Sequence, residues 1–510
     1  MGRKMLRMGL ATLAVSCWCV SGWSAAVAPQ GLPVYNVVNY GAVGDGTTLC
    51  TKSIQKAIDE CAKHGGGKVV IPPGKFLTGS LYLKNNVTFN IGEGATLLAS
   101  MNFDDFPPID TGWRVLSKDI RRSAVVMGFD LENVAVTGRG TINGQGQPWW
   151  DALRKDKHRA AGEKPILTHG RPHTVNLYRC KNVLIEDVTI MNSPSWTIHL
   201  VGCDDVVVDR VSIENPEGSP NTDGINPESC RNVRISNCSI NTNDDCITLK
   251  SGKDEEGRTK ARPTENIVIT NCVMYRGHGA VVVGSEMSGD VRNVTASNIV
   301  CVGTDRAVRI KSTRGRGGVV ENLRFSNFVA VDVNEPIYIT NFYSKSAPEP
   351  VSERTPVFRD IAISNFTIKD SPITAKIEGL PEQPIEGIRI TDVKASTEKG
   401  FLCTDVKGLE LHNMDVNVET GPAFYMKNTT DIELDGLKSS KPTGKDPIVR
   451  LDNCKNTFIR GCRAFSGTDV FLDVLNSATQ NIFMAGNDLS AAAKPYVLGK
   501  GVGRDVISEK

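Results

Sequence analysis

The chain has few aromatic residues and no excess of charge of one sign. Aromatic residues make up 6% of its 510 residues, and 59 lysines and arginines stand against 57 acidic residues. Proteins that bind nucleic acid over a broad surface need a strong basic excess, so the sequence predicts no nucleic-acid partner. The hydrophobic share of 40% and the charged share of 23% exclude a disordered chain and a protein with several membrane spans.

The apolar stretch at the N-terminus is too short to cross a membrane. It covers thirteen residues, 8–20, whereas a spanning helix needs about 20. A basic start precedes it, and Ala26-Val27-Ala28 follows at the spacing that a signal peptidase recognises. We predict a signal peptide over residues 1–28, export to the periplasm or the medium, and no membrane attachment after cleavage. A lipoprotein signal at Cys17 and an uncleaved anchor are the less favoured alternatives.

The cysteines lack the spacing of a metal site. Twelve of the 14 follow the signal segment, from Cys50 to Cys462, and no two of these form a C-x-x-C pair. A large exported protein has no need of a disulfide framework. We expect most of these thiols to be small buried side chains, and we assign no disulfide.

The sequence is rich in one repeated element, a short stretch of Val and Ile that follows an Asn, Asp or Gly. Its spacing varies from 21 to 38 residues, a period that indicates a solenoid or a propeller. The repeats begin at Asn182, Asp205, Asn232, Asn266, Asn293, Asn322, Asp360, Gly387, Gly408, Asp431, Asn456 and Asn481.

Apolar residues alternate within these stretches, which is the periodicity of strands rather than of helices. Variable spacing fits a parallel β-helix, in which the turns between strands can grow freely, and a propeller is the second choice. Residues 51–64 have helical spacing and precede three glycines, so we expect a helix that caps the open end, followed by the first coil from Lys68. We therefore predict an all-β protein with one domain over residues 29–510.

Four repeats carry a second strand whose polar residues align without gaps. Aligned positions of successive coils stack about 4.8 Å apart. We therefore expect Asp223 beside Asp245, and Asp244 beside His278. The four strands cover residues 223–229, 245–251, 279–285 and 306–312.

Alternation along these strands directs more polar side chains to the same face. Any one of them alone would be a turn residue or a solvated side chain. Like charges gathered so closely are costly unless they serve a site. The aligned sets are Asn226, Thr248 and Arg309, then Glu228, Lys250 and Lys311, with Trp196 and His199 one coil earlier.

Paired carboxylates beside an Arg and a Lys suit the cleavage of a glycosidic bond next to an acidic sugar. One carboxyl must hold a proton for the leaving oxygen, and another must be ionised to activate water. Close like charges separate the two pKa values and so divide these roles. The basic residues would bind the carboxylate of the sugar.

Four motifs then occur in order, and with their surroundings they resemble glycoside hydrolase family 28, the polygalacturonases of pectin breakdown. The resemblance extends from Tyr40 to at least Tyr343. It implies a right-handed parallel β-helix and inverting hydrolysis of α-1,4-galacturonosidic bonds, with carboxyl groups far enough apart to hold a water. The motifs are Asn221-Thr222-Asp223, Asp244-Asp245, Gly277-His278-Gly279 and Arg309-Ile310-Lys311.

The resemblance also implies roles for these residues. Asp244 is the expected general acid, Asp223 and Asp245 activate the water, and His278 tunes the acid and contacts substrate. The substrate-binding residues that the resemblance implies are Asn221, Arg309, Lys311, Tyr343 and Glu286. The aligned face adds Lys250 and His199 to the expected substrate-binding residues. We expect no metal and no other cofactor, a pectic polysaccharide or oligogalacturonide as substrate, and a monomer.

The stretch 284–289 resembles bacterial exo-acting members, and Glu286 within it would help to close the cleft. Insertions at residues 104–122, 145–171 and 254–262 fit a blocked pocket. Trp149 and Trp150 in the second insertion could stack on sugar, but packing within the loop is favoured. Exo action that releases galacturonic acid is therefore preferred over endo action or cleavage of a galacturonide in branched pectin.

Two other classes of protein share this architecture. A pectate lyase would use calcium, which the Asp cluster could hold, but the complete hydrolase motifs argue against it. A non-catalytic β-helix surface protein would have no reason to keep an acid cluster in register with His, Arg and Lys.

Overall fold

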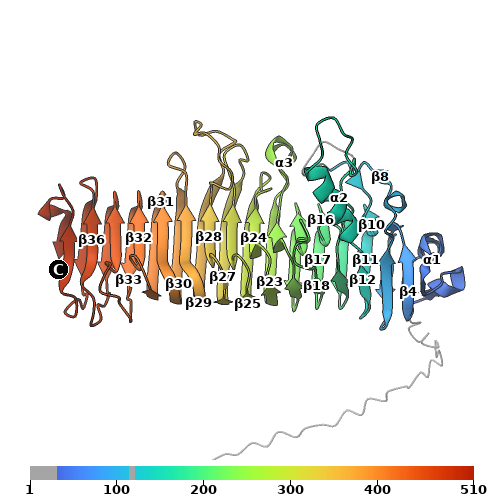
Figure 1. The fold of residues 1–510 in the computed structure, drawn as a ribbon, viewed down its shortest axis with the longest axis horizontal. Coiled ribbons are helices and arrows are strands. Elements are labelled where there is room, and N and C mark those ends of the chain that lie inside the picture. Colours follow the sequence, from blue (N-terminus) through green and yellow to red (C-terminus); the bar gives the residue numbers. More distant parts are fainter. Residues whose placement is uncertain (1–31, 114–120, 510) are drawn as a thin grey trace, which may run out of the picture.

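Each Val- and Ile-rich stretch lies in a strand that pairs in parallel with the equivalent stretch one coil away. The structure, a computed structural model, describes residues 32–113 and 121–509. One sheet of 37 strands winds along an elongated rod (Figure 1). The predicted all-β parallel β-helix is confirmed, and the alternative of a propeller is wrong. The predicted signal peptide and Cys17 lie outside the described residues.

The strands stack in three ladders that run along the rod. The first ladder contains β1 (Val34–Asn36), β3 (Gly67–Ile71), β6 (Val87–Ile91), β11 (Glu132–Thr137), β14 (Lys181–Glu186), β17 (Asp204–Asp209), β20 (Arg231–Ser236), β23 (Thr264–Tyr275), β25 (Val291–Val302), β27 (Val319–Val331), β29 (Val357–Glu378), β30 (Ile385–Thr404), β31 (Val406–Val418), β33 (Thr430–Asp435), β35 (Lys455–Arg460), β37 (Gln480–Ala485) and β39 (Ile507–Glu509). The second ladder contains β2 (Asp45–Leu49), β4 (Gly74–Thr78), β7 (Ala95–Ala99), β12 (Thr141–Asn143), β15 (Thr189–Met191), β18 (Ser212–Glu214) and β21 (Ser239–Asn241), and continues in the long strands from β23.

The third ladder carries the aligned polar face. It contains β5 (Leu81–Tyr82), β10 (Val126–Phe129), β13 (Val175–Tyr178), β16 (Ile198–Val201), β19 (Ile225–Glu228), β22 (Asp245–Leu249), β24 (Gly279–Gly284), β26 (Val308–Lys311), β28 (Ile337–Thr340), the ends of β29 and β30, β32 (Phe424–Lys427), β34 (Val449–Asp452), β36 (Val470–Leu475) and β38 (Lys494–Leu498).

The Asn, Asp or Gly that marks each repeat turns the chain in the left-handed backbone region. All twelve marker positions have φ between 54° and 73°. Gly, Asn and Asp adopt this conformation at the lowest cost, which explains why these residue types mark the repeat. Their side chains also bond from coil to coil, since Asn266 donates to Asn232 over 3.1 Å and Asn293 donates to Asn266.

Alternate side chains of each strand point inward and form one continuous hydrophobic core along the rod. The twelve cysteines of the described residues are all buried and free of disulfides. Three of them stack in successive coils, where the amides of Cys180 and Cys203 each donate over 3.4 Å to the sulfur of the next cysteine. Their interpretation as small core residues is confirmed.

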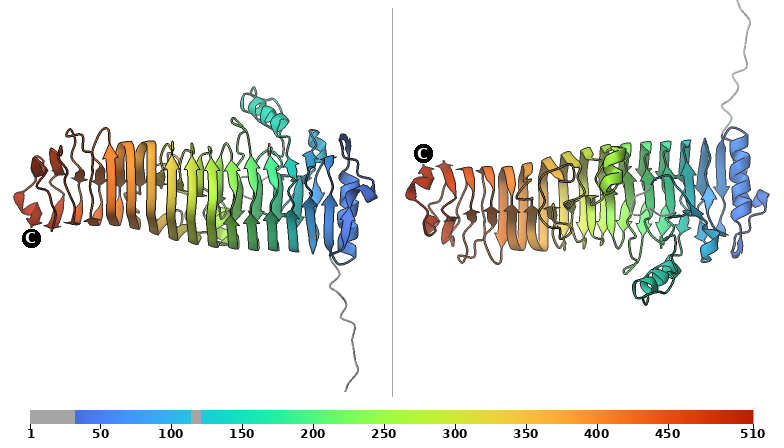
Figure 2. Two further views of the ribbon diagram at one scale, coloured as in Figure 1. Left: turned by 90° about the horizontal axis from the view of Figure 1, so that it is seen from below. Right: turned by 90° about the horizontal axis from the view of Figure 1, so that it is seen from above.

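The capping helix is present as α1 (Thr51–Lys63), and its buried face closes the end of the core. Figure 2 shows it across the blue end of the rod. The expectation that the first strand follows this helix is wrong. β1 and β2 precede α1 and pair with β3 and β4, so the helix is a connection within the first coil.

The insertions project from one side of the rod, where α2 (Gln147–Lys157) and α3 (Asp254–Lys260) are seen in Figure 1. The first insertion contributes an antiparallel pair, β8 (Pro108–Ile109) and β9 (Arg121–Arg122). Single-turn helices are η1 (Val37–Tyr40), η2 (Phe103–Asp105) and η3 (Arg504–Val506). Across residues 32–113 and 121–509, every helix is too short or too polar to cross a membrane.

Trp149 and Trp150 hold the second insertion against the rod. The ring of Trp149 is fully buried and stacks on Phe103 with 3.7 Å between ring centroids. Trp150 Nε1 donates to the carbonyl of Ser193 over 3.1 Å. The packing interpretation of these tryptophans is confirmed.

Two substitutions at Asn266 separate its backbone role from its side-chain role. Asn266→Gly keeps the left-handed turn but loses the bonds to Asn232 and Asn293, at about 0.5–1.5 kcal/mol each. Asn266→Val also places a β-branched residue at positive φ, which adds about 1–2 kcal/mol. We expect Asn266→Val to have the lower thermal unfolding midpoint, followed by circular dichroism. Equal midpoints for the two variants would contradict a backbone role for this position.

Candidate active site

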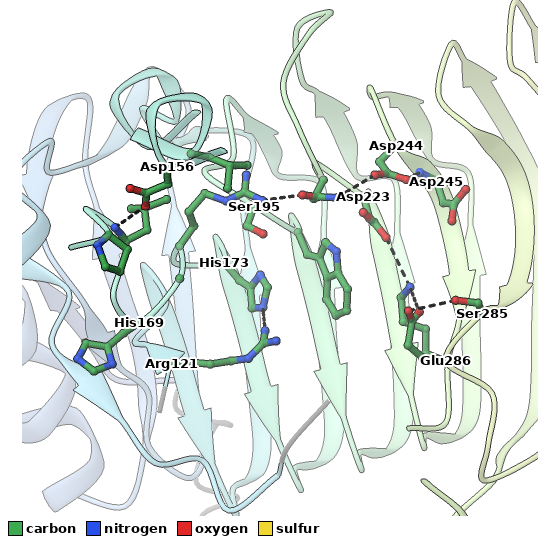
Figure 3. Close-up of a pocket in the computed structure, with 18 of the residues that line it drawn as sticks. Arg121, Asp156, His169, His173, Ser195, Asp223, Asp244, Asp245, Ser285 and Glu286 are labelled. Carbon is green, nitrogen blue, oxygen red and sulfur yellow. Dashed lines mark hydrogen bonds and ion pairs between the residues drawn. The ribbon is translucent and has the colours of Figure 1, made fainter. Parts of the chain in front are cut away.

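A pocket of about 630 Å³ lies on the third ladder, where β16, β19 and β22 begin. Figure 3 shows Asp223, Asp244 and Asp245 toward one end of it and Arg121 and His169 toward the other. The residues expected in the site that line this pocket are Asn221, Asp223, Asp244, Asp245, Lys250, Glu286, Lys311 and Tyr343.

The strands pair in the predicted register, which brings the acidic residues together. β19 and β22 pair so that Asp223 and Asp245 occupy equivalent positions, and β24 continues this register with His278 beside Asp244. One oxygen of each of the three carboxylates lies within 4.8 Å of the other two.

The nearest carboxylate oxygens of this cluster are close together for an inverting enzyme, whose carboxyl groups must leave room for a water. Carboxyl pairs of inverting enzymes usually lie about 6.5–9.5 Å apart. However, two oxygens that each accept a hydrogen bond of about 2.8 Å from the same water lie about 4.6 Å apart. The spacing therefore suits a water held directly between two of the carboxylates.

Asp245 is buried and forms ion pairs with both basic residues of the Arg-Ile-Lys motif. Arg309 Nη1 lies 3.1 Å from its Oδ1, and Lys311 Nζ lies 2.6 Å from its Oδ2. These two cations come from β26, two coils beyond β22. Both contacts are shielded from water, so the two cations hold the Asp245 carboxylate firmly in place.

Asp244 accepts hydrogen bonds on both of its oxygens. His278 Nδ1 lies 3.1 Å from Oδ1, the Asp245 amide donates to the same oxygen over 2.9 Å, and Asn221 Nδ2 lies 3.4 Å from Oδ2. Burial alone would raise the pKa of Asp244, but the bond and charge of His278, together with the charge of Lys311 and the bond from the Asp245 amide, outweigh it and lower the pKa. The same bond raises the pKa of His278, which is half exposed.

Asp223 experiences the opposite balance. Burial and then the negative charge of Asp244 raise its pKa well above the usual value, while the ammonium of Lys250 opposes them from 3.7 Å away. Asn226 donates to Asp223 over 3.3 Å. The surroundings thus favour the protonated forms of Asp223 and His278 and the ionised form of Asp244, the expected acid.

Glu286 is held in the pocket and is not a solvated turn residue. Its carboxylate pairs with Lys250 over 2.9 Å and accepts from the Ser285 hydroxyl over 3.2 Å. Burial would raise the pKa of Glu286, but the charge of Lys250 and its hydrogen bond lower it to about 2. The Lys250 ammonium also lies 4.6 Å from the centre of the Trp196 ring.

His199 was expected to contact substrate, but it is fully buried and is not among the residues that line the pocket. Its Nε2 lies 2.9 Å from Oε2 of Glu228. The other oxygen of that carboxylate, Oε1, accepts a hydrogen bond from Trp113 Nε1 over 3.3 Å. Burial raises the pKa of Glu228 to about 7 and lowers that of His199. The alignment of His199 with Asn226 is correct, but both side chains lie beneath the pocket surface.

Tyr343 is exposed and lines the pocket. Its ring lies near both cations of the motif, 5.2 Å from Lys311 Nζ and 5.8 Å from Arg309 Cζ. The ring can therefore cover a sugar carboxylate that these cations bind.

Much of the pocket lining comes from residues that the sequence analysis did not select. His173 occupies the position equivalent to Trp196 one coil earlier, so an extension of the alignment by one coil would have identified it. Its ring stacks on Trp196 with centroids 5.3 Å apart. The second insertion adds Leu153, Asp156, Arg159, Pro165, Leu167, Thr168, His169, Gly170 and Arg171.

The other two insertions contribute less than expected. Of the described residues in the first insertion only Arg121 lines the pocket, and the third insertion supplies no lining residue. Within the third, α3 is held against the loop that follows β26, two coils further along, because Arg258 donates to the carbonyls of Gly315 and Arg316. Blocking of the pocket by all three insertions is therefore not found.

The three carboxylates have the proximity that a calcium site needs, as do His412, Glu433 and Asp435 far along the rod. In the pocket, however, Arg309 and Lys311 already compensate Asp245, and Lys250 lies beside Asp223. A divalent cation would be repelled by these three positive charges. The cluster is therefore better suited to acid–base chemistry than to metal binding.

The sequence profile described as "Glycosyl hydrolases family 28" matches residues 61–417. The chain belongs to this family. A probable polygalacturonase of Vitis vinifera is 34% identical over 73% of this chain and 77% of that protein. An endo-polygalacturonase of Pectobacterium carotovorum subsp. carotovorum is 30% identical over 71% of this chain and 87% of that protein. The structure of a hyperthermoactive exopolygalacturonase from Thermotoga maritima matches with a TM-score of 0.65 and 33% identity, over 72% of this chain and 87% of that chain.

The Asp244–His278 bond of this family 28 chain is directly testable. Asp244→Asn removes the negative charge that raises the pKa of His278, so this pKa should fall toward about 6.5, the ordinary value for histidine. Nuclear magnetic resonance of the imidazole protons, titrated with pH, measures it. Asp305→Asn is the matched control, because Asp305 contributes least to the shift. An unchanged His278 pKa in Asp244→Asn would contradict the pairing.

Proposed function

We propose that the chain hydrolyses α-1,4-galacturonosidic bonds in pectin or polygalacturonate with inversion, after export to the periplasm or the medium. The observation that carries this proposal is the cluster of three carboxylates beside Arg309 and Lys311 in a pocket. The polygalacturonase names of its relatives support the choice of an acidic sugar as substrate. We propose that the protein acts as a monomer and without a cofactor.

Arg309 and Lys311 bind the carboxylate of a galacturonate. Lys311 lines the pocket directly, and both cations lie near the exposed ring of Tyr343, which also lines it. A substrate carboxylate that shares these cations weakens their hold on Asp245. The Asp245 carboxylate is then freer to bind the attacking water, so that substrate binding itself prepares the site for attack.

Asp244 gives a proton to the leaving glycosidic oxygen. In the free site that proton lies on His278, because the bond between the two groups lowers the pKa of Asp244 and raises that of His278. We propose that His278 passes its Nδ1 proton to Asp244 Oδ1, and that the carboxyl group so formed gives this same proton to the leaving oxygen, which leaves His278 neutral and Asp244 ionised again. Asp223 and Asp245 hold the water, and one of them accepts its proton during attack on the anomeric carbon.

We propose exo action with release of galacturonic acid. The second insertion forms much of one end of the pocket, and the buried Lys250–Glu286 pair adds further lining. The exopolygalacturonase from Thermotoga maritima supports this choice, whereas the relative from Pectobacterium is named for endo action. The size of the first products decides between the two.

Purified protein incubated with polygalacturonate in EDTA should release reducing ends without the ultraviolet chromophore of an unsaturated product. Monomeric galacturonic acid should appear from the first time point, and proton resonance should show it as the β-anomer first. Asp244→Asn should lower kcat/KM by about 10²–10⁴-fold, the usual effect of losing a general acid.

Each other product pattern contradicts one part of the proposal. A ladder of oligomers would indicate endo action, and an initial α-anomer would indicate retention. An unsaturated product, in EDTA or after addition of calcium, would indicate a lyase. Failure to cut polygalacturonate with or without calcium would exclude it as the substrate.

The pH profile of kcat/KM should be bell-shaped, and both limbs should lie above the ordinary values for Asp and His. The acidic limb reports Asp223, whose raised pKa delays its ionisation, and the alkaline limb reports loss of the proton that His278 shares with Asp244. The charges that face His278 are Asp244, Asp245 and Asp305, and all three favour its protonated form. His278→Ala should move the alkaline limb to lower pH, and an unmoved limb would contradict the proton route.

A further inference from the structure

Arg171 is the last residue of the second insertion, and its guanidinium reaches the loops that precede β16 and β19. Nη1 donates to the carbonyl of Pro194 over 2.8 Å and to that of Pro220 over 2.7 Å. Nη2 donates to Oδ1 of Asn221 over 2.8 Å. One side chain therefore fixes three coils relative to one another at the entrance to the acid cluster.

A guanidinium can only donate hydrogen bonds, so Arg171 determines which way the Asn221 amide faces. With Oδ1 bound to Arg171, Nδ2 of Asn221 is directed to Oδ2 of Asp244, 3.4 Å away. Asn221 itself has a left-handed φ of 53°, a conformation that asparagine tolerates. Without Arg171 the amide could rotate and present its oxygen to the carboxylate of Asp244, which would repel it.

The charge of Arg171 also acts on the cluster. Burial lowers the pKa of this guanidinium to about 10, against the opposing charges of Asp223 and Asp244, so it remains a cation near neutral pH. The groups that face Asp244 are thus His278, Lys311 and Arg171 as cations, and Asp223 and Asp245 as acids. Arg171 is the member of this set that the repeat does not supply.

We propose that Arg171 is a positioning residue, which orients Asp244 through the Asn221 amide and so links the second insertion to the chemistry of the repeat. The expected effect on turnover rests on the proposed function. The orientation of the Asn221 amide by Arg171 rests on geometry alone. Asp244 must face the leaving oxygen, and a misplacement of about 1 Å can cost about 10²-fold in rate. Arg171 would then act on turnover rather than on substrate affinity.

The kinetic test compares Arg171→Gln, Arg171→Lys and a matched control. Arg171→Gln should lower kcat by about 10–100-fold with KM unchanged within about threefold. Arg171→Lys keeps the charge but not the fork of donors, so it should recover only part of the loss. Lys155→Met, an exposed change on α2 of the same insertion, should leave both constants unchanged. A raised KM at unchanged kcat would overturn the proposal, because it would mean that Arg171 binds substrate directly.

A double-mutant cycle with Asn221 tests the route of action. If Arg171 acts through the amide, Asn221→Ala with Arg171→Gln should be no worse than Asn221→Ala alone. Independent, additive losses would mean that Arg171 acts elsewhere. Unfolding midpoints equal to wild type establish that the variants are folded. If Arg171→Gln does not fold, the same cycle is run with Arg171→Lys, which should show the same non-additivity.

The His278 titration separates this proposal from the proposed function, because it needs no substrate. Without the positive charge of Arg171, the negative charge of Asp244 acts on His278 with less opposition. The pKa of His278 should therefore rise further in Arg171→Gln and change little in Arg171→Lys, which keeps the charge. A His278 pKa equal to wild type in Arg171→Gln would overturn the proposed role of Arg171. If the wild-type protein fails to cut polygalacturonate while the His278 pKa shifts as expected, the proposed substrate is refuted and the role of Arg171 is retained.

Discussion

The structure depends on the parallel register that stacks each residue on its equivalent in the next coil. Backbone hydrogen bonds set this register, and about 4.8 Å then separates equivalent side chains over the whole rod. Inside, stacked aliphatic side chains bury one another, and the same register stacks Cys180, Cys203 and Cys230. At the turns it stacks asparagines, which bond to one another in a line.

On the third ladder the same register gathers like charges, which is unfavourable unless neighbouring coils compensate. Asp223 and Asp245 stack directly, and the cations that compensate them are Lys250 from the same coil as Asp245 and Arg309 and Lys311 from two coils beyond. On the other side of the acids, the positions equivalent to Asp223 in the two preceding coils hold neutral rings, those of Trp196 and His173. The pocket therefore has a cationic side that suits a carboxylate and, on the other side of the acids, a wall of stacked and largely buried rings.

The register also explains what sequence could predict. An alignment of equivalent strands was enough to predict that Asp223 lies beside Asp245 and Asp244 beside His278. Asn and Asp mark the repeat because the chain adopts a left-handed φ at these positions. His199 illustrates the limit. Its coil position was correct, but its burial depends on the side chains that surround it, which are the rings of His173, Tyr178 and Trp196 and the carboxylate of Glu228. The pairing of Arg309 and Lys311 with Asp245 likewise depends on side-chain reach across two coils, which the alignment does not specify.

A groove formed by a repeating rod is similar at every coil and so cannot by itself distinguish the end of a polymer from its middle. Only segments outside the repeat can break that similarity, and the second insertion does so by forming one end of the pocket. If such a segment were attached only at its own ends, it could move without affecting the acids. Arg171 removes that freedom, because it joins the insertion to the carbonyls of Pro194 and Pro220 and to Asn221 beside Asp244. The segment that shapes the pocket is thereby rigidly coupled to the residue proposed to protonate the leaving group, so changes in the insertion should affect turnover as well as product size.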